Sequence, residues 1–450
     1  MRVEEGRAPD AAQRQGGGRP QQPSAEAGAG DRGRPGAEGR DHPAASVRGH
    51  APDAERPPAL VELDRATAEP DVGAVLHAVL VSALFLSALL VGTDVGAPVL
   101  ADELQGLIAV VLVGGEGTRL RPLTLTTPKQ LLPIAEVTMI ERVLGHLAGH
   151  GVEKAVLSMG YRPDAFLAAF PGDRCAGVAL TYAVEPEPLD TAGAIAFAAR
   201  HASVADTFLA VNGDVLTDLD VGSLVEFHRQ RAATATIHLT PVEDPSAYGV
   251  VLTAADGRVV TFIEKPAAGE AATNLVNAGT YVLEPSVVDR IPAGHRVSIE
   301  RDTFPALVAE AKVFAMASAG YWLDAGTPAT YLRANLDAIR RATPPAPGAR
   351  RGDSGVWTVG RPVIDGDLIA PALVGDAAFV AGEARVEDAV VGAGARVLAG
   401  ARVTRSVLLP GAVVGARATV TGAVVGEGAA VAESTTVAEG CLVAGGSRVE

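Results

Sequence analysis

The sequence predicts an α/β domain built on a mostly parallel sheet, followed by a C-terminal parallel β-helix. Three observations support this prediction. Strand and helix patterns alternate between residues 107 and 341, as in strands joined by crossover helices. A glycine-rich turn follows the first apolar strand in that region. Beyond residue 362 the spacing of aliphatic residues changes to six, which is typical of a β-helix.

Length and composition limit the classes of protein to consider. A chain of 450 residues is too long for one hydrophobic core and predicts two or three domains. The net charge of −15 argues against nucleic acid as a general partner. Cys175 and Cys441 lie far apart and form no metal-binding or redox motif, so we expect buried thiols in a reducing compartment.

The first hundred residues differ in character from the rest. Residues 1–70 have few aliphatic residues and no aromatic residue, and are predicted to be a disordered tail. Val72 to Gly92 carries no charge and is long enough to span a bilayer. Arginines precede it and none follows until Arg119, so the positive-inside rule would export the rest of the chain. Two interpretations of residues 71–100 remain: a helix packed on the protein or lying at a membrane surface, or, as we favour, an over-extended gene start.

Residues 101–341 are predicted to form the α/β domain. Its strand patterns are Leu107–Val113, Lys154–Met159, Thr207–Val211 and Ala235–Thr240, and its helix patterns are Met139–His150, Ala192–His201 and Val221–Arg231. Ligands of such sheets bind at the carboxyl ends of the strands. Residues 342–362, rich in proline and glycine, are predicted to be a linker to the next domain.

Residues 363–450 carry a six-residue repeat of one aliphatic and several small residues. The repeated aliphatic positions are Val374, Val380, Val386, Val391, Val397, Val403, Leu409, Val425, Val431, Val437 and Val443, with occasional five-residue steps. Each aliphatic side chain would stack on the coil below it. The alternative is an ordinary sheet rich in Ala, Val and Gly.

The stretch from Leu107 to Ile134 carries the clearest chemical signal. Its apolar strand ends in Gly114-Gly115-Glu116-Gly117, which exposes backbone N–H groups, and Arg119 and Lys129 follow. Such donors and cations suit a polyphosphate. The spacing fits neither a Walker loop nor a Rossmann fingerprint. The alternative is an ordinary turn with surface arginines.

Two aspartates end short apolar runs. Asp214 follows the strand Thr207–Val211, and Asp324 lies in the run Tyr321 to Thr327. Carboxylates close to a polyphosphate would hold Mg²⁺. The alternative for Asp214 is a simple Asn-Gly-Asp turn.

The motif GG-x-GTRLRPLT…PKQLLPI resembles the N-terminal motif of the sugar-1-phosphate nucleotidyltransferases, most closely that of the mannose-1-phosphate guanylyltransferases. The resemblance runs from about Leu107 to Ile339 and extends to the tail, but omits the first hundred residues. It implies a Rossmann-like nucleotidyltransferase domain with a left-handed β-helix. It also implies a cytoplasmic, Mg²⁺-dependent enzyme that joins a nucleoside triphosphate to a sugar 1-phosphate. GTP with mannose 1-phosphate is our first choice, and glucose 1-phosphate with dTTP or UTP is the alternative.

The resemblance also implies roles for individual residues. Arg119, Lys129 and Lys265 would be catalytic; Val113, Gly114, Gly115, Gly117, Thr118 and Gly193 would bind the nucleotide; Glu185, Gly249, Glu264, Asn277 and Gly279 would bind the sugar; Asp214 and Asp324 would bind the metal. One position departs from the family pattern: Asp190 stands where glycine is usual in the L-G-T-A-G-A loop. This departure could change base or sugar preference.

Three alternative functions compete with this interpretation. An acyltransferase active in the β-helix lacks an imidazole base, because no histidine follows His295. A non-catalytic regulatory subunit would be expected to lose the cationic or acidic site residues, which are all present. A membrane-anchored interaction protein would depend on the apolar run before residue 100. The β-helix is expected to mediate homo-oligomer contacts.

Overall fold

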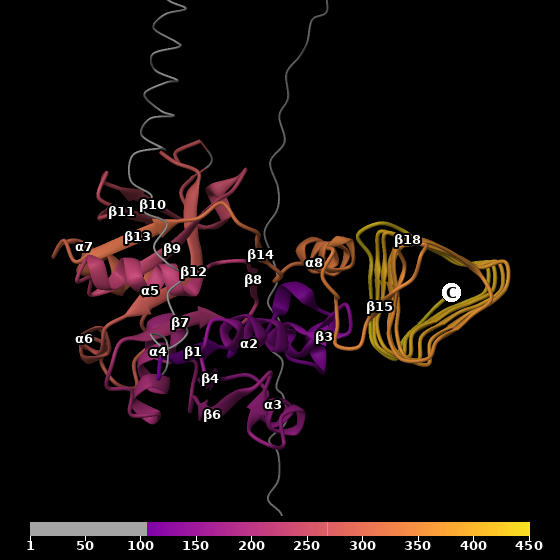
Figure 1. Ribbon diagram of the computed structural model, residues 1–450, viewed down its shortest axis with the longest axis horizontal. Coiled ribbons are helices and arrows are strands. Elements are labelled where there is room, and N and C mark those ends of the chain that lie inside the picture. Colours follow the sequence, from indigo (N-terminus) through magenta and orange to yellow (C-terminus); the bar gives the residue numbers. More distant parts are fainter. Residues whose placement is uncertain (1–105, 268) are drawn as a thin grey trace, which may run out of the picture. The chain divides into compact units, whose positions relative to one another are not determined.

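The computed structural model describes residues 106–267 and 269–450 (Figure 1). The predicted disordered tail, residues 1–70, and the apolar segment, residues 71–100, therefore lie outside the described residues. Within the described part of the chain, no helix is both long enough and apolar enough to cross a membrane.

Parallel strands form the centre of a ten-stranded sheet. β1 (Ile108–Leu112) lies between β4 (Lys154–Met159) and β7 (Phe208–Asn212) and pairs in parallel with both. β6 (Val178–Val184) extends the parallel sheet beyond β4. The middle of β1 is fully buried, as expected for apolar strands covered on both faces. The predicted mostly parallel α/β core is confirmed.

Antiparallel strands extend the sheet beyond β7. β12 (Leu275–Leu283) pairs antiparallel with β7 and carries the remaining strands on that side. These are β9 (Ala235–Pro241), β10 (Gly249–Thr253), β11 (Val259–Glu264) and β13 (Val313–Ala317), while the short β5 (Arg174–Cys175) ends the other side. The alternating pattern of the sequence does not predict β12.

Helices cover the two faces of the sheet (Figure 1). The helices are α2 (Met139–Gly149), α3 (Pro163–Ala169), α4 (Asp190–His201), α5 (Val221–Gln230), α6 (Pro285–Asp289), α7 (Phe304–Val308) and α8 (Pro328–Arg340). α2 packs into one hydrophobic cluster through Ile140 and Leu144, and α4 packs into another through Ile195. A capping box between Thr138 and Glu141 fixes the start of α2.

The C-terminal region is a stack of short parallel strands (Figure 1). They are β16 (Trp357–Thr358), β17 (Val363–Ile364), β18 (Asp367–Val374), β19 (Phe379–Val380), β20 (Arg385–Val391), β21 (Arg396–Val397), β22 (Arg402–Thr404), β23 (Val407–Leu408), β24 (Val413–Val414), β25 (Thr419–Thr421), β26 (Val424–Val425), β27 (Ala430–Val431), β28 (Thr436–Val437), β29 (Leu442–Val443) and β30 (Arg448–Val449), with the antiparallel β15 (Arg350–Arg351) at the start.

The register of this stack explains the six-residue repeat. Arg396 pairs with Val413, 17 residues later, and Ala430 pairs with Arg448, 18 residues later. Three six-residue steps make a coil of 18, and one five-residue step shortens it to 17. The repeated aliphatic side chains are all buried, as predicted. The arrangement is consistent with the predicted left-handed β-helix. The prediction of buried thiols is confirmed for Cys175 and wrong for Cys441, which is exposed.

A separate hydrophobic cluster joins the α/β domain to the β-helix. It contains Leu120 and Tyr331 from the first domain, and Trp357 and Val407 from the second. The Trp357 indole N–H donates to the Ile339 carbonyl at 3.1 Å. The described boundary between the two domains is therefore a packed contact.

Candidate functional site

The glycine loop directly follows β1 at the carboxyl edge of the parallel strands. Val113 is buried and donates its N–H to the Ser158 carbonyl at 3.0 Å. Gly117 has a φ of 62°, and a Cβ there would lie 3.1 Å from Lys129 Cβ. A larger residue would therefore strain the backbone and push on Lys129. The loop is compact because its glycines let Lys129 and the neighbouring chain approach.

Two cations follow the loop on short 3₁₀ turns and meet the two predicted metal ligands. Arg119 lies in Thr118–Leu120 and Lys129 in Lys129–Leu131. Lys129 Nζ contacts Asp214 Oδ2, and both side chains are largely buried. Arg119 Nη2 lies 3.9 Å from Asp324 Oδ2. The structure thus brings together Arg119, Lys129, Asp214 and Asp324, which we call the charged cluster.

A two-stranded sheet positions both aspartates. Asp214 lies between β7 and β8 (Val215–Thr217), and β8 pairs antiparallel with β14 (Trp322–Asp324). In that register Asp324 lies opposite Val215, and the Ala325 N–H donates to the Asp214 carbonyl at 3.0 Å. The two carboxylates come from residues 110 positions apart (324 − 214) and converge because of this pairing.

The electrostatics of the cluster suit a divalent cation. Burial raises the pKa of the Asp324 carboxyl, and the nearby Asp214 carboxylate raises it further. A cation held between them would relieve both effects. Mg²⁺ is commonly bound by one or two carboxylates together with substrate phosphates, so the two aspartates fit it. Within the described residues, no group of three or more His, Cys, Asp or Glu residues is placed to hold a metal by itself.

The E-K-P motif lies at the end of β11, next to Gly249. Glu264 pairs in register with Gly249, and a Cβ at Gly249 would lie 2.8 Å from Glu264 Oε2. Burial, followed by the charge of Glu300, raises the pKa of the Glu264 carboxyl. Lys265 has a φ of 51°, and its ammonium lies 3.5 Å from Glu264 Oε1. Its side chain is 65% exposed, and the structure does not bring it into contact with the charged cluster.

The Asn277 and Gly279 motif lies where β12 departs from regular pairing. The register of β12 against β9 shifts between Asn277 and Tyr281. The Asn277 amide donates to the Tyr281 hydroxyl at 2.8 Å, and its oxygen accepts from the Gly279 N–H at 3.1 Å. Gly279 has a φ of 74°, and a Cβ there would lie 2.5 Å from the Asn212 side chain. This bulge therefore packs on the strand that leads to Asp214.

Glu185 and the first part of the glycine loop line a cavity of about 450 Å³. Glu185 follows β6 and accepts from the Ser158 hydroxyl at 3.0 Å and from the Leu189 N–H at 3.1 Å. Gly114 and Gly115 line the same cavity. Gly193, which does not line it, lies in α4, and a Cβ there would be 2.7 Å from the His295 carbonyl oxygen. Gly193 thus allows the segment around residue 297 to pack on α4.

The turn that follows this segment has no signal in the sequence. Ile299–Thr303 forms a π-helical turn whose Glu300 carboxylate accepts from the Thr191 hydroxyl at 2.7 Å. Arg301 Nη2 donates to Asp190 Oδ2 at 2.9 Å. Single π turns frequently occur at functional sites, but the letters IERDT carry no periodic signal that would predict one.

Asp190 has an unusual backbone that its ion pair does not offset. Its φ is 60°, a conformation that costs an L residue about 1–2 kcal/mol. Its partner Arg301 is 64% exposed, and an exposed ion pair contributes about 0–1 kcal/mol. The Asp190 carboxylate also accepts from the Thr191 N–H at 2.9 Å, a local hydrogen bond of the kind that lets aspartate adopt this conformation.

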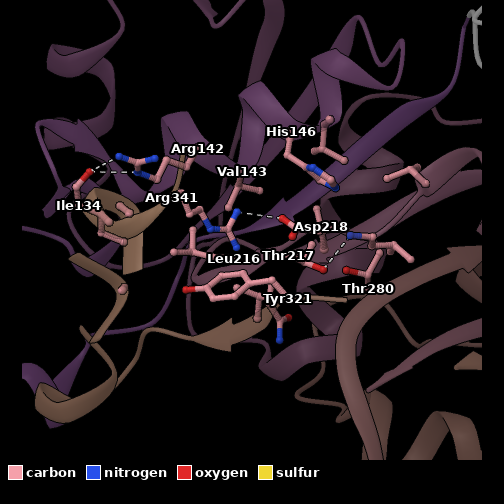
Figure 2. A pocket seen from close by; sticks show the side chains of 18 residues that line it. Ile134, Arg142, Val143, His146, Leu216, Thr217, Asp218, Thr280, Tyr321 and Arg341 are labelled. Carbon is pink, nitrogen blue, oxygen red and sulfur yellow. Dashed lines mark hydrogen bonds and ion pairs between the residues drawn. The ribbon is translucent and has the colours of Figure 1, made fainter. Parts of the chain in front are cut away.

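A second cavity lies behind the two-stranded sheet, between α2, β8 and α8. Figure 2 shows Arg341 reaching Asp218, with which it forms an ion pair of 3.1 Å, above the Tyr321 ring. The cavity measures about 250 Å³. In the part of the chain that the structure describes, no residue predicted for catalysis or ligand binding lines it. The candidate site is therefore the one at the carboxyl edge of the sheet.

Substitution of Gly249 by Ala tests the close approach of Glu264. We expect the methyl group to displace the Glu264 carboxylate, because it would lie 2.8 Å from Oε2 and 2.7 Å from Phe262 Cζ. The measurement is KM for the sugar 1-phosphate that the sequence resemblance implies, and we expect it to rise about tenfold, the equivalent of one hydrogen bond. The matched control is Gly149→Ala, where the added Cβ meets no atom within 4 Å. Equal KM values for the two variants would contradict the placement of the sugar beside Glu264.

Comparison with known proteins gives two family matches. The family described as nucleotidyl transferase matches residues 108–341, and the family described as GlmU-like, C-terminal hexapeptide, matches residues 366–447. A protein of Mycobacterium tuberculosis named mannose-1-phosphate guanylyltransferase is 42% identical over 287 residues, which cover 63% of this chain and 79% of that protein. A rice protein, Oryza sativa subsp. japonica, named probable mannose-1-phosphate guanylyltransferase 3, is 40% identical over 299 residues, covering 63% and 78%. Among solved structures, HddC from Yersinia pseudotuberculosis matches with a TM-score of 0.46 and 28% identity, over 51% of this chain and 99% of that one.

Proposed function

Because the chain belongs to the nucleotidyl transferase family, we propose that it transfers a nucleotidyl group from a nucleoside triphosphate to a sugar 1-phosphate. The proposed substrates are GTP and mannose 1-phosphate, and the products are GDP-mannose and pyrophosphate. The names of the relatives from Mycobacterium tuberculosis and rice support this choice. The observation that carries the proposal is the convergence of two cations and two carboxylates beside the glycine loop.

The proposed reaction is a single in-line displacement. An oxygen of the sugar 1-phosphate attacks the α-phosphorus of GTP, the bond to the β-phosphate oxygen breaks, and pyrophosphate leaves. Two anions must approach each other, so the protein has to oppose their repulsion. Arg119 and Lys129 would neutralise the triphosphate, and Lys265 would meet the sugar phosphate. The displacement requires no protein nucleophile.

Asp214 and Asp324 would hold Mg²⁺. When bound, the ion supplies charge neutralisation at the phosphates and fixes their orientation. The contact between Lys129 and Asp214 keeps the ammonium next to the predicted metal ligand, and so next to the phosphates bound there. The glycine loop would contribute backbone N–H groups to the same phosphates.

Location and assembly are part of the proposal. Nucleoside triphosphates are abundant in the cytoplasm, so we place the reaction there. The stacked parallel strands of the β-helix present flat faces, which favour association. We therefore propose a homo-oligomer with contacts through the β-helix.

The test is a panel of four nucleoside triphosphates against mannose, glucose and N-acetylglucosamine 1-phosphates, with pyrophosphate release as the readout. We expect the highest kcat/KM for GTP with mannose 1-phosphate, and complete loss of turnover on chelation of divalent metal. A preference for dTTP or UTP with glucose 1-phosphate would replace these substrates by the alternative pair. No pyrophosphate release with any pair would contradict the proposal and favour a non-catalytic subunit.

A further inference from the structure

Asp190 lines the 450 Å³ cavity with a left-handed backbone, and the Thr191 N–H and Arg301 hold its carboxylate there. Residues held in sparsely populated conformations cluster at ligand-binding sites. The question is which ligand group the Asp190 carboxylate meets.

The lining of the cavity identifies the end of the substrate that enters it. Gly114 and Gly115 of the glycine loop line it, together with the carboxylates of Glu116, Glu185, Glu187 and Asp190 and the guanidinium of Arg296. Of the predicted sugar residues only Glu185 lines it, whereas Gly249, Glu264, Asn277 and Gly279 do not. The cavity therefore extends from the glycine loop away from most of the predicted sugar residues and toward the nucleoside, and its carboxylates suit hydrogen-bond donors.

Guanine is the common base whose donors best fit a carboxylate. Its N1–H and 2-amino group are adjacent donors that one carboxylate can accept together. Adenine presents an acceptor at N1, and uracil and thymine present a single N–H. We propose that Asp190 is a specificity-determining residue that accepts hydrogen bonds from the guanine N1–H and 2-amino group. This inference rests on the proposed function and specifies how the base is selected.

Existing contacts orient the Asp190 carboxylate and leave it capacity to accept. Oδ1 accepts from the Thr191 N–H at 2.9 Å, and Oδ2 accepts from Arg301 Nη2 at 2.9 Å. An ionised carboxylate has about four acceptor sites, so sites remain on both oxygens. Arg301 is a positioning residue, because it holds the charged carboxylate against the cavity wall.

Thr191 and Glu300 hold the turn that carries Arg301. The Thr191 hydroxyl donates to Glu300 and accepts from the Ile299 N–H at 2.8 Å. The Val297 carbonyl accepts from the Ala192 and Gly193 N–H groups. These bonds join residues about 110 positions apart and fix Arg301 relative to Asp190.

The experiment compares GTP with ITP, which lacks the 2-amino group. Binding to the full-length protein is measured by calorimetry, and kcat/KM is measured with mannose 1-phosphate. We expect the wild type to prefer GTP over ITP about 10- to 100-fold, the range for hydrogen bonds to a charged group. Asp190→Gly, which suits the left-handed backbone, should fold normally and reduce this preference at least tenfold. Arg301→Met should reduce it in the same direction.

The matched control is Glu310→Gln, which breaks the exposed ion pair of Glu310 with Arg290, neither of which lines the cavity. It should leave the preference unchanged. An unchanged GTP/ITP ratio in Asp190→Gly, or a loss of preference in Glu187→Gln alone, would overturn the assignment. Because the ratio is measured by binding as well as by turnover, it is tested separately from the proposed reaction.

Discussion

Replacing Asp214 by Asn should lower kcat for nucleotidyl transfer by about 10²–10³-fold, the typical loss when one electrostatic contact of a transition state is removed. The asparagine has nearly the same shape and can still accept a hydrogen bond from Lys129, whose ammonium contacts Asp214 Oδ2. What it loses is the negative charge that would hold the divalent ion with Asp324. The variant should therefore fold normally but lose most of its nucleotidyl transfer activity. The measurement is kcat in both directions across a range of Mg²⁺ concentrations.

The control for this variant is Asp218→Asn. Asp218 lies four residues later, is half exposed and pairs with Arg341 at the other cavity (Figure 2), which no residue of the charged cluster lines. This substitution should leave kcat within a few-fold of the wild type, because an exposed ion pair contributes little. Asp324→Asn should behave like Asp214→Asn. Near-native pyrophosphorolysis by Asp214→Asn at saturating Mg²⁺ would show that the metal assignment is wrong.

The second large effect concerns the contact between the two domains. Trp357→Ala should lower the free energy of unfolding by about 3–5 kcal/mol, the usual cost of removing a buried aromatic side chain. Trp357 is 4% exposed and packs in the cluster that joins Tyr331 to the coils of the β-helix. Urea denaturation followed by far-ultraviolet circular dichroism measures the change, because Trp357 is one of only two tryptophans and its loss would alter fluorescence.

Trp357→Phe is the matched variant. It keeps most of the packing but loses the hydrogen bond from the indole N–H to the Ile339 carbonyl. We expect it to cost about 1–3 kcal/mol, the range for leaving a buried carbonyl without its partner. If the alanine variant unfolded at the same urea concentration as the wild type, the contact between the domains would not contribute to stability.

The elements that could be predicted from sequence have a local signal. The run Ile108–Leu112 is apolar and β-branched, so it reads as a buried strand, and the glycines directly after it mark the loop. The valines six apart in the tail predict stacked coils because each coil repeats its own local pattern. Asp214 and Asp324 could be proposed because each ends a short apolar run.

The parts that could not be predicted depend on contacts between distant segments. Lys265 carries a recognisable motif, but the place of its strand β11 in the sheet follows from antiparallel pairing with β10, which the composition does not reveal. The turn Ile299–Thr303 has no pattern of its own and is fixed by hydrogen bonds to Thr191. The ion pair between Asp190 and Arg301 joins residues 111 positions apart, so it can be recognised only once the fold is known.

The most direct test of the central claim is the stereochemical course at the α-phosphorus, measured with a single diastereomer of GTPαS and mannose 1-phosphate. We expect inversion of configuration, because the site only aligns the two substrates and neutralises their charge. The residues that would do so are Arg119, Lys129, Asp214 and Asp324. Retention would require a covalent nucleotidyl-enzyme intermediate and would contradict the account.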